Sequence, residues 1–202
     1  WNPRALLGPH PCTIDGQRRL VIRAWFPHAA QVSVIPTPMS PSPIPMTRFH
    51  EAGLFEAVVP EDTPVPLYRF TVTRRDGTVI ETHDPYAFPP LLTDFELHLF
   101  AEGTWYKAYE RLGSHVRRVE DVAGVHFVVW APNAVRVSVI GDFNRWDGRC
   151  HPMVSRGATG LWELFVPDLQ EEALYKYEIL GRHNGALLVK ADPYAYAGEL
   201  RP

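Results

Sequence analysis

Residues 130–148 read WAPNAVRVSVIGDFNRWDG, and this stretch decides how the rest of the chain is interpreted. Residues 135–140 alternate, so the three valines are predicted to point to one side and the residues between them to the other. This two-residue period is typical of a half-buried strand. After Gly141 the chain is rich in turn-forming residues, yet it carries two aromatic rings, Phe143 and Trp146. A turn needs no large rings for its own conformation, so they either pack under the sheet or contact something from solvent.

The same pattern occurs twice in the chain, at a separation of about 105 residues. The paired segments are LGPH (7–10) and LGSH (112–115), WFPHA (25–29) and WAPNA (130–134), VSVI (32–35) and VSVI (137–140), GLFE (53–56) and GLWE (160–163), LYRF (67–70) and LYKY (174–177), and DPYAF (84–88) and DPYAY (192–196). The separation grows by only about three residues over the whole unit, which predicts one fold occurring twice.

Each unit contains short alternating runs separated by Gly, Pro, Asn and Asp, with no helical pattern between them. In the second unit the expected strands are 125–130, 135–140, 161–166, 174–180 and 187–190. Such spacing and a unit of about 100 residues predict an immunoglobulin-like antiparallel β-sandwich. The predicted fold class is therefore all-β, with two tandem immunoglobulin-like β-sandwiches joined by a short helical linker. The expected boundaries are 1–92 for the first sandwich, 93–113 for the linker and 114–202 for the second sandwich.

The predicted linker begins at residues 93–96, TDFE, which have the form of a helix capping box. Phe95, Leu99 and Phe100 follow at helical spacing, and residues 104–111 are expected to form a second short helix. An apolar face on this segment predicts that it packs against a domain as a fixed joint rather than a flexible tether.

Composition excludes several classes of function. The formal net charge is −3 and the charged residues are not clustered, so nothing indicates a nucleic-acid partner; a neutral polymer is the more natural one. No apolar run approaches membrane-spanning length and no leader opens the chain. The chain starts at Trp1 rather than at a methionine, which is compatible with a trimmed N-terminus. Cys12 and Cys150 lie in different predicted domains and should stay unpaired, as expected in the cytoplasm.

Four segments in a fixed order carry a family resemblance. They are WAPNAVRVSVIGDFNRWDGRCHPM (130–153), GLWELFVP (160–167), LYKYEI (174–179) and DPYAY (192–196). Together they resemble the family 48 carbohydrate-binding module that precedes the catalytic barrel of bacterial glycogen branching enzymes. The resemblance covers the last half of the chain closely and the first half more loosely.

The resemblance implies a 1,4-α-glucan branching enzyme of glycogen biosynthesis as the parent protein. Its partners would be α-glucan, such as glycogen or maltooligosaccharides, and a C-terminal α-amylase-type barrel starting near Pro202. It implies no nucleic acid, no membrane and no cofactor. Two alternatives stay open: the N-terminal module of a debranching or trehalose-forming amylase-family enzyme, and a non-enzymatic β-sandwich pair for protein interaction.

The candidate carbohydrate-binding residues are Trp146, Lys176 and Asn144. In related glycogen-binding modules the tryptophan at this place is a sugar platform and a lysine at the YKY-type position contacts the sugar. Aromatic rings stack on the apolar faces of glucose, while amide and amine groups bind its hydroxyls. The structural alternatives are partial burial of Trp146 at a domain interface and a solvated strand lysine at position 176. A second tryptophan is missing before Asp192, so binding should be weak.

The other tryptophans are interpreted structurally. Trp25 and Trp130 at equivalent strand ends, and Trp162 within a strand, are expected to be core anchors. In the first unit the loop after the equivalent strand is replaced by a proline-rich stretch, 36–46, which should be stiff and extended. The first unit is therefore expected to be a spacer or docking domain without a sugar site.

No catalytic residue is assigned. Retaining glycosyl transfer needs two carboxylates about 5 Å apart on a rigid scaffold, whereas Asp142 and Asp147 share a loop. The nine histidines show no metal-ligand spacing, and no phosphate-binding or hydrolase motif is present. The chain alone is therefore expected to be inactive and to hold no metal.

Overall fold

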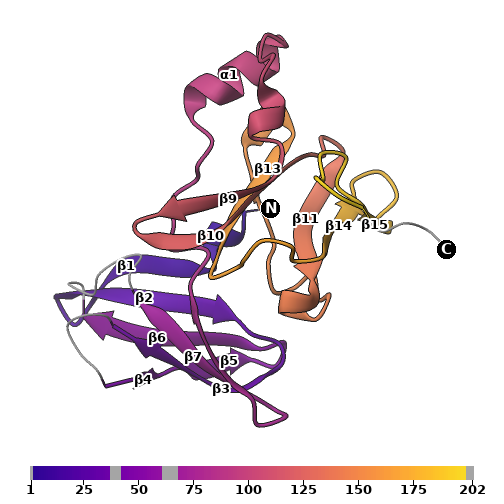
Figure 1. The fold of residues 1–202 in the computed structure, drawn as a ribbon. Helices are drawn as coiled ribbons and strands as arrows, with labels where there is room; N and C mark the ends of the chain where they lie inside the picture. Colours follow the sequence, from indigo (N-terminus) through magenta and orange to yellow (C-terminus); the bar gives the residue numbers. More distant parts are fainter. Residues whose placement is uncertain (1, 37–41, 61–67, 199–202) are drawn as a thin grey trace. The chain divides into compact units, whose positions relative to one another are not determined.

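The computed structural model describes residues 2–36, 42–60 and 68–198. Its strands form four antiparallel sheets, two in each of two compact units (Figure 1). One unit consists mainly of residues 3–89 and the other mainly of residues 90–198. The predicted all-β fold is confirmed.

The first sandwich has two four-stranded sheets. One has the strand order β1 (Gly8–Ile14), β2 (Gln17–Trp25), β6 (Leu54–Pro60), β5 (Thr47–His50), and the other has the order β4 (Ile44–Pro45), β3 (Ala29–Ile35), β7 (Arg69–Arg74), β8 (Val79–His83). A short 3-10 helix, η1 (Pro3–Ala5), precedes them. Alternate residues face the core, with Leu20, Ile22 and Ala24 of β2 all buried. Burying such alternate apolar faces against each other stabilises a sandwich.

The second sandwich repeats this topology (Figure 1). One sheet has the order β9 (Gly113–Val119), β10 (Val122–Trp130), β13 (Leu161–Pro167), β12 (Val154–Ser155), and the other has the order β11 (Ala134–Gly141), β14 (Tyr175–Gly181), β15 (Leu187–Lys190). Four short helices belong to this unit: α1 (Asp94–Glu102), η2 (Ala108–Glu110), η3 (Asp142–Asn144) and η4 (Gly157–Thr159). The five strands expected here all occur, and β9 and β12 are additional to them.

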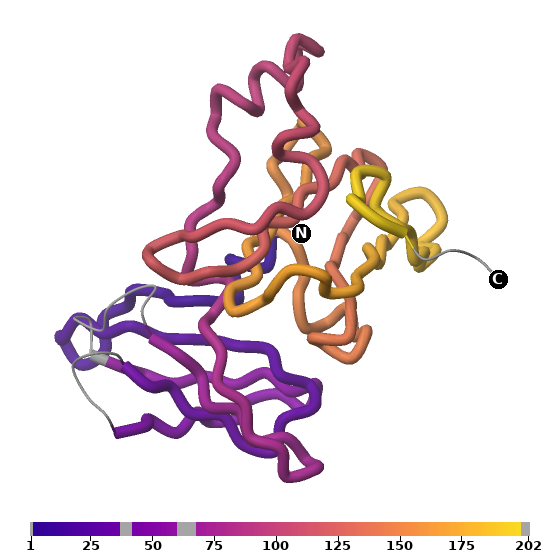
Figure 2. The backbone as a smooth tube through the Cα atoms, in the orientation of Figure 1, coloured from indigo at the N-terminus to yellow at the C-terminus, as the bar shows by residue number. Residues whose placement is uncertain are grey.

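The repeat extends to individual contacts, so the two units share one fold. Figure 2 traces the backbone of the two units along the sequence. Trp25 pairs with Leu54 in the first unit, as Trp130 pairs with Leu161 in the second. Ser33 pairs with Pro45, as Ser138 forms a bridge with Pro152. The strand register shifts at Ala29/Gln31 in the first unit and at Ala134/Arg136 in the second. Leu67, which begins one of the repeated segments, lies outside the described residues. Cys12 and Cys150 form no disulfide, as predicted.

Each sandwich is closed by a buried aspartate of its DPYA segment. In the first, the Tyr68 hydroxyl donates to Asp84, whose Oδ1 accepts from the Tyr86 amide at 2.9 Å. In the second, the Asp192 carboxylate takes the same position with an extra donor. Its Oδ2 accepts from the hydroxyls of Tyr175 and Tyr177 at 2.6 and 3.0 Å. The recurrence of DPYA thus has a physical cause, a carboxylate that satisfies buried hydroxyls.

The predicted capping box is confirmed. The Thr93 hydroxyl accepts from the Glu96 amide at 3.2 Å, and Glu96 Oε2 accepts from the Thr93 amide at 2.8 Å. The packing face differs from the expectation, because Phe95 is 68% exposed while Leu97 and Phe100 pack against the sheet. The second helix is only the 3-10 turn η2, since residues 104–107 make other local contacts.

The helical segment, here residues 91–112, packs on the outer face of the β10–β13 sheet. Leu92 and Leu112 of this segment form an apolar cluster with Val128 of β10 and Leu161 of β13. All seven residues of β13 are therefore buried, not every second one. The two-residue alternation expected from the sequence is lost here, because a helical layer lies on one face and the sandwich core on the other.

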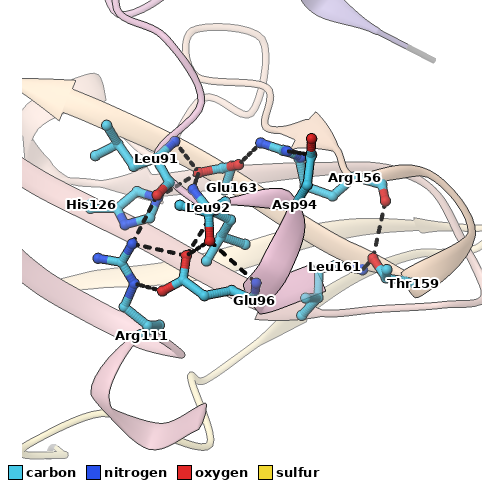
Figure 3. A network of polar contacts seen from close by, with 11 residues as sticks. Leu91, Leu92, Asp94, Glu96, Arg111, His126, Arg156, Thr159, Leu161 and Glu163 are labelled. Atoms are coloured by element: carbon cyan, nitrogen blue, oxygen red, sulfur yellow. Dashed lines mark hydrogen bonds and ion pairs between the residues drawn. The ribbon is translucent and has the colours of Figure 1, made fainter. Parts of the chain in front are cut away.

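A buried carboxylate ties the segment to this sheet (Figure 3). Glu163 Oε2 accepts from the Leu91 and Leu92 amides at 2.8 and 3.0 Å and lies 2.8 Å from His126 Nε2. Its Oε1 accepts from Arg156. Burial alone would raise the pKa of Glu163, but the hydrogen bonds from His126 and the two amides outweigh it and hold the pKa below its usual value. The carboxylate is therefore charged and saturated with donors.

His126 shares this environment as a neutral ring. Burial lowers its pKa, and the bond to Glu163 offsets this only in part. The hydrogen on Nε2 then points to Glu163, and Nδ1 is buried without a partner.

Two of the three tryptophans differ from the prediction, because neither Trp130 nor Trp25 is a buried core residue. Trp130 is 58% exposed and is not a core anchor. Its Nε1 donates to the Thr159 carbonyl at 3.1 Å, and its ring meets Phe100 edge to face at 6.2 Å. Trp25 is half-buried and makes the equivalent bond to the Ala52 carbonyl. Trp162 is buried, as predicted.

Gly113→Ala should destabilise the second sandwich strongly. Gly113 has φ +98°, and a Cβ would lie 2.9 Å from the Tyr194 Cβ. A left-handed conformation costs a non-glycine residue about 1–2 kcal/mol, and the clash adds about 1–3 kcal/mol. Gly185→Ala is the matched control, since Gly185 has φ +63° and nothing near its Cβ position. Equal losses of unfolding free energy in urea titrations of the two variants would contradict the close packing.

Candidate carbohydrate-binding site

The loop that follows β11 begins at a glycine for reasons of space. A Cβ on Gly141 would lie 2.2 Å from the Leu174 carbonyl oxygen and 2.5 Å from the Phe143 ring. The turn η3 then starts directly at the strand end. The loop thus leaves the sheet at a point where only a residue without a side chain fits.

Asn144 is buried beneath this loop, with 5% of its surface exposed. Its Oδ1 accepts from the Gly141 amide at 2.9 Å, and its Nδ2 donates to the Val139 carbonyl at 2.9 Å. The second Nδ2 hydrogen points to His151 Nδ1, also at 2.9 Å. Both amide hydrogens are used inside the protein, so the structure gives Asn144 a place in holding the loop and not on its surface.

His151 is half-buried and completes this network as an acceptor. Burial lowers the pKa of His151 to about 4, so the ring is neutral at pH 7. Its backbone also continues the sheet, because the Val139 amide donates to the His151 carbonyl at 3.1 Å. The loop and the segment after it are therefore fixed to β11 by both side-chain and main-chain bonds.

Trp146 lies at the tip of the loop in a strained backbone conformation. Arg145 and Trp146 both have φ +59°, a left-handed conformation that is uncommon for such residues. The Trp146 amide donates to the Gly141 carbonyl at 2.9 Å, and the indole Nε1 donates to Asp142 Oδ1 at 2.8 Å. These two bonds fix the ring while 40% of the residue stays exposed. Backbone strain of this kind occurs at binding sites, where it presents a side chain.

Lys176 reaches the same ring from β14. It pairs with Ile140 in the strand register, and its Nζ lies 5.9 Å from the centroid of the Trp146 ring. An ammonium at this distance from an indole face makes a favourable cation–π contact. The structure thus brings together two of the three residues that the sequence singled out, Trp146 and Lys176.

Polar residues absent from the prediction surround this pair. Glu178, two positions after Lys176, binds Arg136 at 2.6 Å. Its carboxylate oxygen would lie 2.1 Å from a Cβ on Gly148, so the end of the loop rests on Glu178. Alternation along β14 places Lys176 and Glu178 on one face, and this signal was available in the sequence. The arrangement offers a flat ring beside an amine and carboxylates, which suits a neutral polyhydroxylated ligand.

The loop carboxylates are bound to neighbours. Asp142 accepts from the Trp146 indole, and Asp147 forms an ion pair with Arg149 at 2.7 Å. Among the described residues no group of three or more His, Cys, Asp and Glu side chains could hold a metal ion. No helix in the described part of the chain is long and apolar enough to cross a membrane.

Two family models cover most of the chain. Residues 111–195 match carbohydrate-binding module 48 (isoamylase N-terminal domain), and residues 1–86 match the N-terminal domain of alpha-1,4-glucan branching enzyme GlgB. The class of the second sandwich is therefore that of a family 48 carbohydrate-binding module. Along its whole length the chain is similar to the N-terminal region of 1,4-alpha-glucan branching enzymes GlgB, which confirms the resemblance seen in the sequence.

Three relatives illustrate this similarity. The chain is 47% identical to GlgB from Nitrosospira multiformis over 207 residues, 47% to GlgB from Synechococcus elongatus over 202 residues, and 46% to GlgB from Nitrosococcus oceani over 202 residues. In each case the match covers 100% of this chain and 26% of the relative. The chain thus spans about a quarter of the length of the curated relatives that it matches.

The stability of the second sandwich should fall in acid because of His151. A histidine with a lowered pKa supports folding above its unfolded pKa of about 6.5 and loses that support as the pH falls toward 4. The loss is roughly 3 kcal/mol at 1.4 kcal/mol per pH unit. His151→Gln keeps an acceptor for Asn144 without titrating and should weaken the pH dependence. Amide exchange at Val137 and Val139 between pH 7 and 4 measures it.

The matched control is His183→Gln, since His183 is exposed. This variant should follow the wild-type protein at every pH. Parallel pH profiles for the wild-type protein and His151→Gln would contradict a neutral His151 with a lowered pKa.

Proposed function

We propose that this chain is the glucan-binding N-terminal region of a 1,4-α-glucan branching enzyme. The second sandwich contacts α-glucan through Trp146 and Lys176, and Asn144 holds the loop that presents the tryptophan. The parent protein cuts α-1,4 chains and rejoins them through α-1,6 links in a C-terminal α-amylase-type barrel. Glycogen biosynthesis in the cytoplasm is the proposed setting, with neither nucleic acid nor a membrane as a partner.

The observation that carries this proposal is the pairing of an exposed indole with a lysine from another element. The Trp146 ring is fixed by its bond to Asp142, and the Lys176 amine lies 5.9 Å from its centroid. A ring fixed before binding loses little conformational entropy when a sugar stacks on it. A lone indole platform gives weak binding, which suits a module that holds a long polymer by several contacts.

The first sandwich favours a branching enzyme over the other amylase-family enzymes considered. Residues 1–86 match the family model of the GlgB N-terminal domain. The relatives that match this chain from end to end are GlgB proteins.

We assign the first sandwich a spacer or docking role. The loop equivalent to 141–148 is replaced there by the proline-rich stretch 36–46, of which 37–41 lie outside the described residues. The described end of this stretch contains the short strand β4 and the buried Met46. The boundaries 1–92, 93–113 and 114–202 are part of this proposal, with the helical segment belonging structurally to the second sandwich.

Trp146→Ala should weaken maltoheptaose binding about tenfold, the effect of losing one well-placed aromatic contact. Because the ring is 40% exposed but hydrogen-bonded, the unfolding free energy should fall by only about 1–2 kcal/mol. Lys176→Gln should weaken binding by a smaller factor with little effect on stability. Binding is measured by tryptophan fluorescence or calorimetry, and stability by urea unfolding.

Trp130→Ala is the matched control, because Trp130 is also an exposed tryptophan of this sandwich but lies outside the loop. It should leave sugar binding unchanged. Equal affinities of the wild-type protein and Trp146→Ala for maltoheptaose would contradict the proposal that the loop 141–148 binds glucan.

The purified chain should not alter amylose. Retaining glycosyl transfer needs two available carboxylates about 5 Å apart, whereas the loop carboxylates Asp142 and Asp147 are engaged by Trp146 and Arg149. Iodine staining and a reducing-end assay measure this. Turnover by the 202-residue chain, with Asp142→Asn as a variant to locate its source, would overturn the assignment of catalysis to a separate barrel.

A further inference from the structure

The second sandwich contains a hollow, apart from the Trp146 loop, that is lined by aromatic and polar side chains. It has a volume of about 440 Å³ and is formed by Tyr109, Glu110, His115, Tyr194 and Tyr196. These residues come from η2, β9 and the turn after β15. None belongs to β11, the loop 141–148 or β14, so the hollow is separate from the Trp146 site.

One wall of the hollow is an exposed ring held by hydrogen bonds rather than by burial. Tyr196 is 81% exposed, yet its hydroxyl lies 3.2 Å from His115 Nδ1. His115 Nε2 lies 3.0 Å from the Leu112 carbonyl, which can only accept, so Nε2 carries the hydrogen and Nδ1 accepts from Tyr196. The two rings also meet edge to face at 5.9 Å. The tyrosine face is thereby fixed while it stays open to solvent.

The backbone of a second lining residue, Tyr194, is also held in place. The Tyr194 amide donates to Asp192 Oδ1 at 2.8 Å, and the Tyr194 Cβ packs where Gly113 leaves room. Tyr194 is 45% exposed and Tyr109 is 59% exposed. In the first sandwich the positions equivalent to Tyr194 and Tyr196 are Tyr86 and Phe88, and both are buried. The same repeated segment thus presents open tyrosines only in the second sandwich.

The composition of the hollow indicates its ligand. Its lining contains tyrosine, glutamate and histidine but no aliphatic side chain. An apolar protein contact would resemble the edge strand β15, where Leu187, Leu188 and Val189 are exposed. Exposed tyrosine faces, of which that of Tyr196 is fixed, combine here with a carboxylate and an imidazole. They suit a ligand that is apolar on its faces and rich in hydroxyls at its edges. We propose that this hollow is a second α-glucan contact, which holds a short stretch of a maltooligosaccharide.

The proposal takes its ligand class from the proposed function but uses different residues. Two weak contacts on one module would hold a long glucan more tightly than either contact alone, since the second binds at a raised local concentration. Because the two contacts use different residues, each can be read at its own amides on the same protein.

The experiment is a maltoheptaose titration of the ¹⁵N-labelled 202-residue chain, followed by amide chemical shifts. The hollow is reported by residues 113–115 and 194–196, and the loop by residues 144–148. Saturable shifts are expected at the hollow. Tyr196→Ala and Tyr109→Ala should each weaken the affinity read there about tenfold, leaving the affinity read at the loop within about twofold.

Tyr106→Ala is the matched control, because Tyr106 is 88% exposed and does not line the hollow. It should change neither reading. The proposal is overturned if the amides of the hollow do not shift with sugar, or if both tyrosine variants bind there as the wild-type protein does. Failure of the Trp146 proposal would appear instead at residues 144–148, so the two outcomes are distinguishable.

Discussion

The carboxylate of Asp192 holds the residues next to both proposed glucan contacts of the second sandwich. It accepts hydrogen bonds from the Tyr175 and Tyr177 hydroxyls and from the Tyr194 amide. Burial raises the pKa of both tyrosine hydroxyls, so they remain protonated donors. The buried Tyr177 hydroxyl would otherwise be a polar group without a bond, which costs about 1–3 kcal/mol.

This arrangement sets which way β14 faces. Because Tyr175 and Tyr177 turn inward to Asp192, the residue between them, Lys176, must turn outward. There it meets the Trp146 ring. The same carboxylate accepts from the Tyr194 amide and so holds the turn after β15, whose Tyr194 and Tyr196 line the hollow. One buried group thereby connects the packing of the sandwich with two exposed surfaces.

The loop 141–148 shows how a surface residue can be positioned by a buried one. Asn144 lies inside, where it binds the backbone at Val139 and Gly141 and the ring of the half-buried His151. Outside, Trp146 adopts a left-handed backbone that exposes part of its ring. Strain of this kind persists when surrounding bonds over-determine the conformation. The duplicated sandwich supplies the frame, and the differences between its two copies lie in loops, as is usual where a scaffold carries a site.

The sequence by itself determined the repeat, the all-β class, the helix cap at Thr93 and the pairing of Trp146 with Lys176 as candidates. Strand alternation, turn residues and capping boxes are local patterns, and local patterns can be read without knowing what packs where. Even the inward tyrosines around Lys176 follow from a period of two.

Only the tertiary structure decided which side chains are covered. Trp130 resembles a core anchor in sequence but is exposed, whereas β13 is buried on both faces because a helical segment lies on the sheet. Asn144 resembles a surface ligand in the sequence, but its side-chain amide is hydrogen-bonded to Val139, Gly141 and His151. Burial and hydrogen-bond saturation depend on residues distant in the chain, and no local pattern contains them.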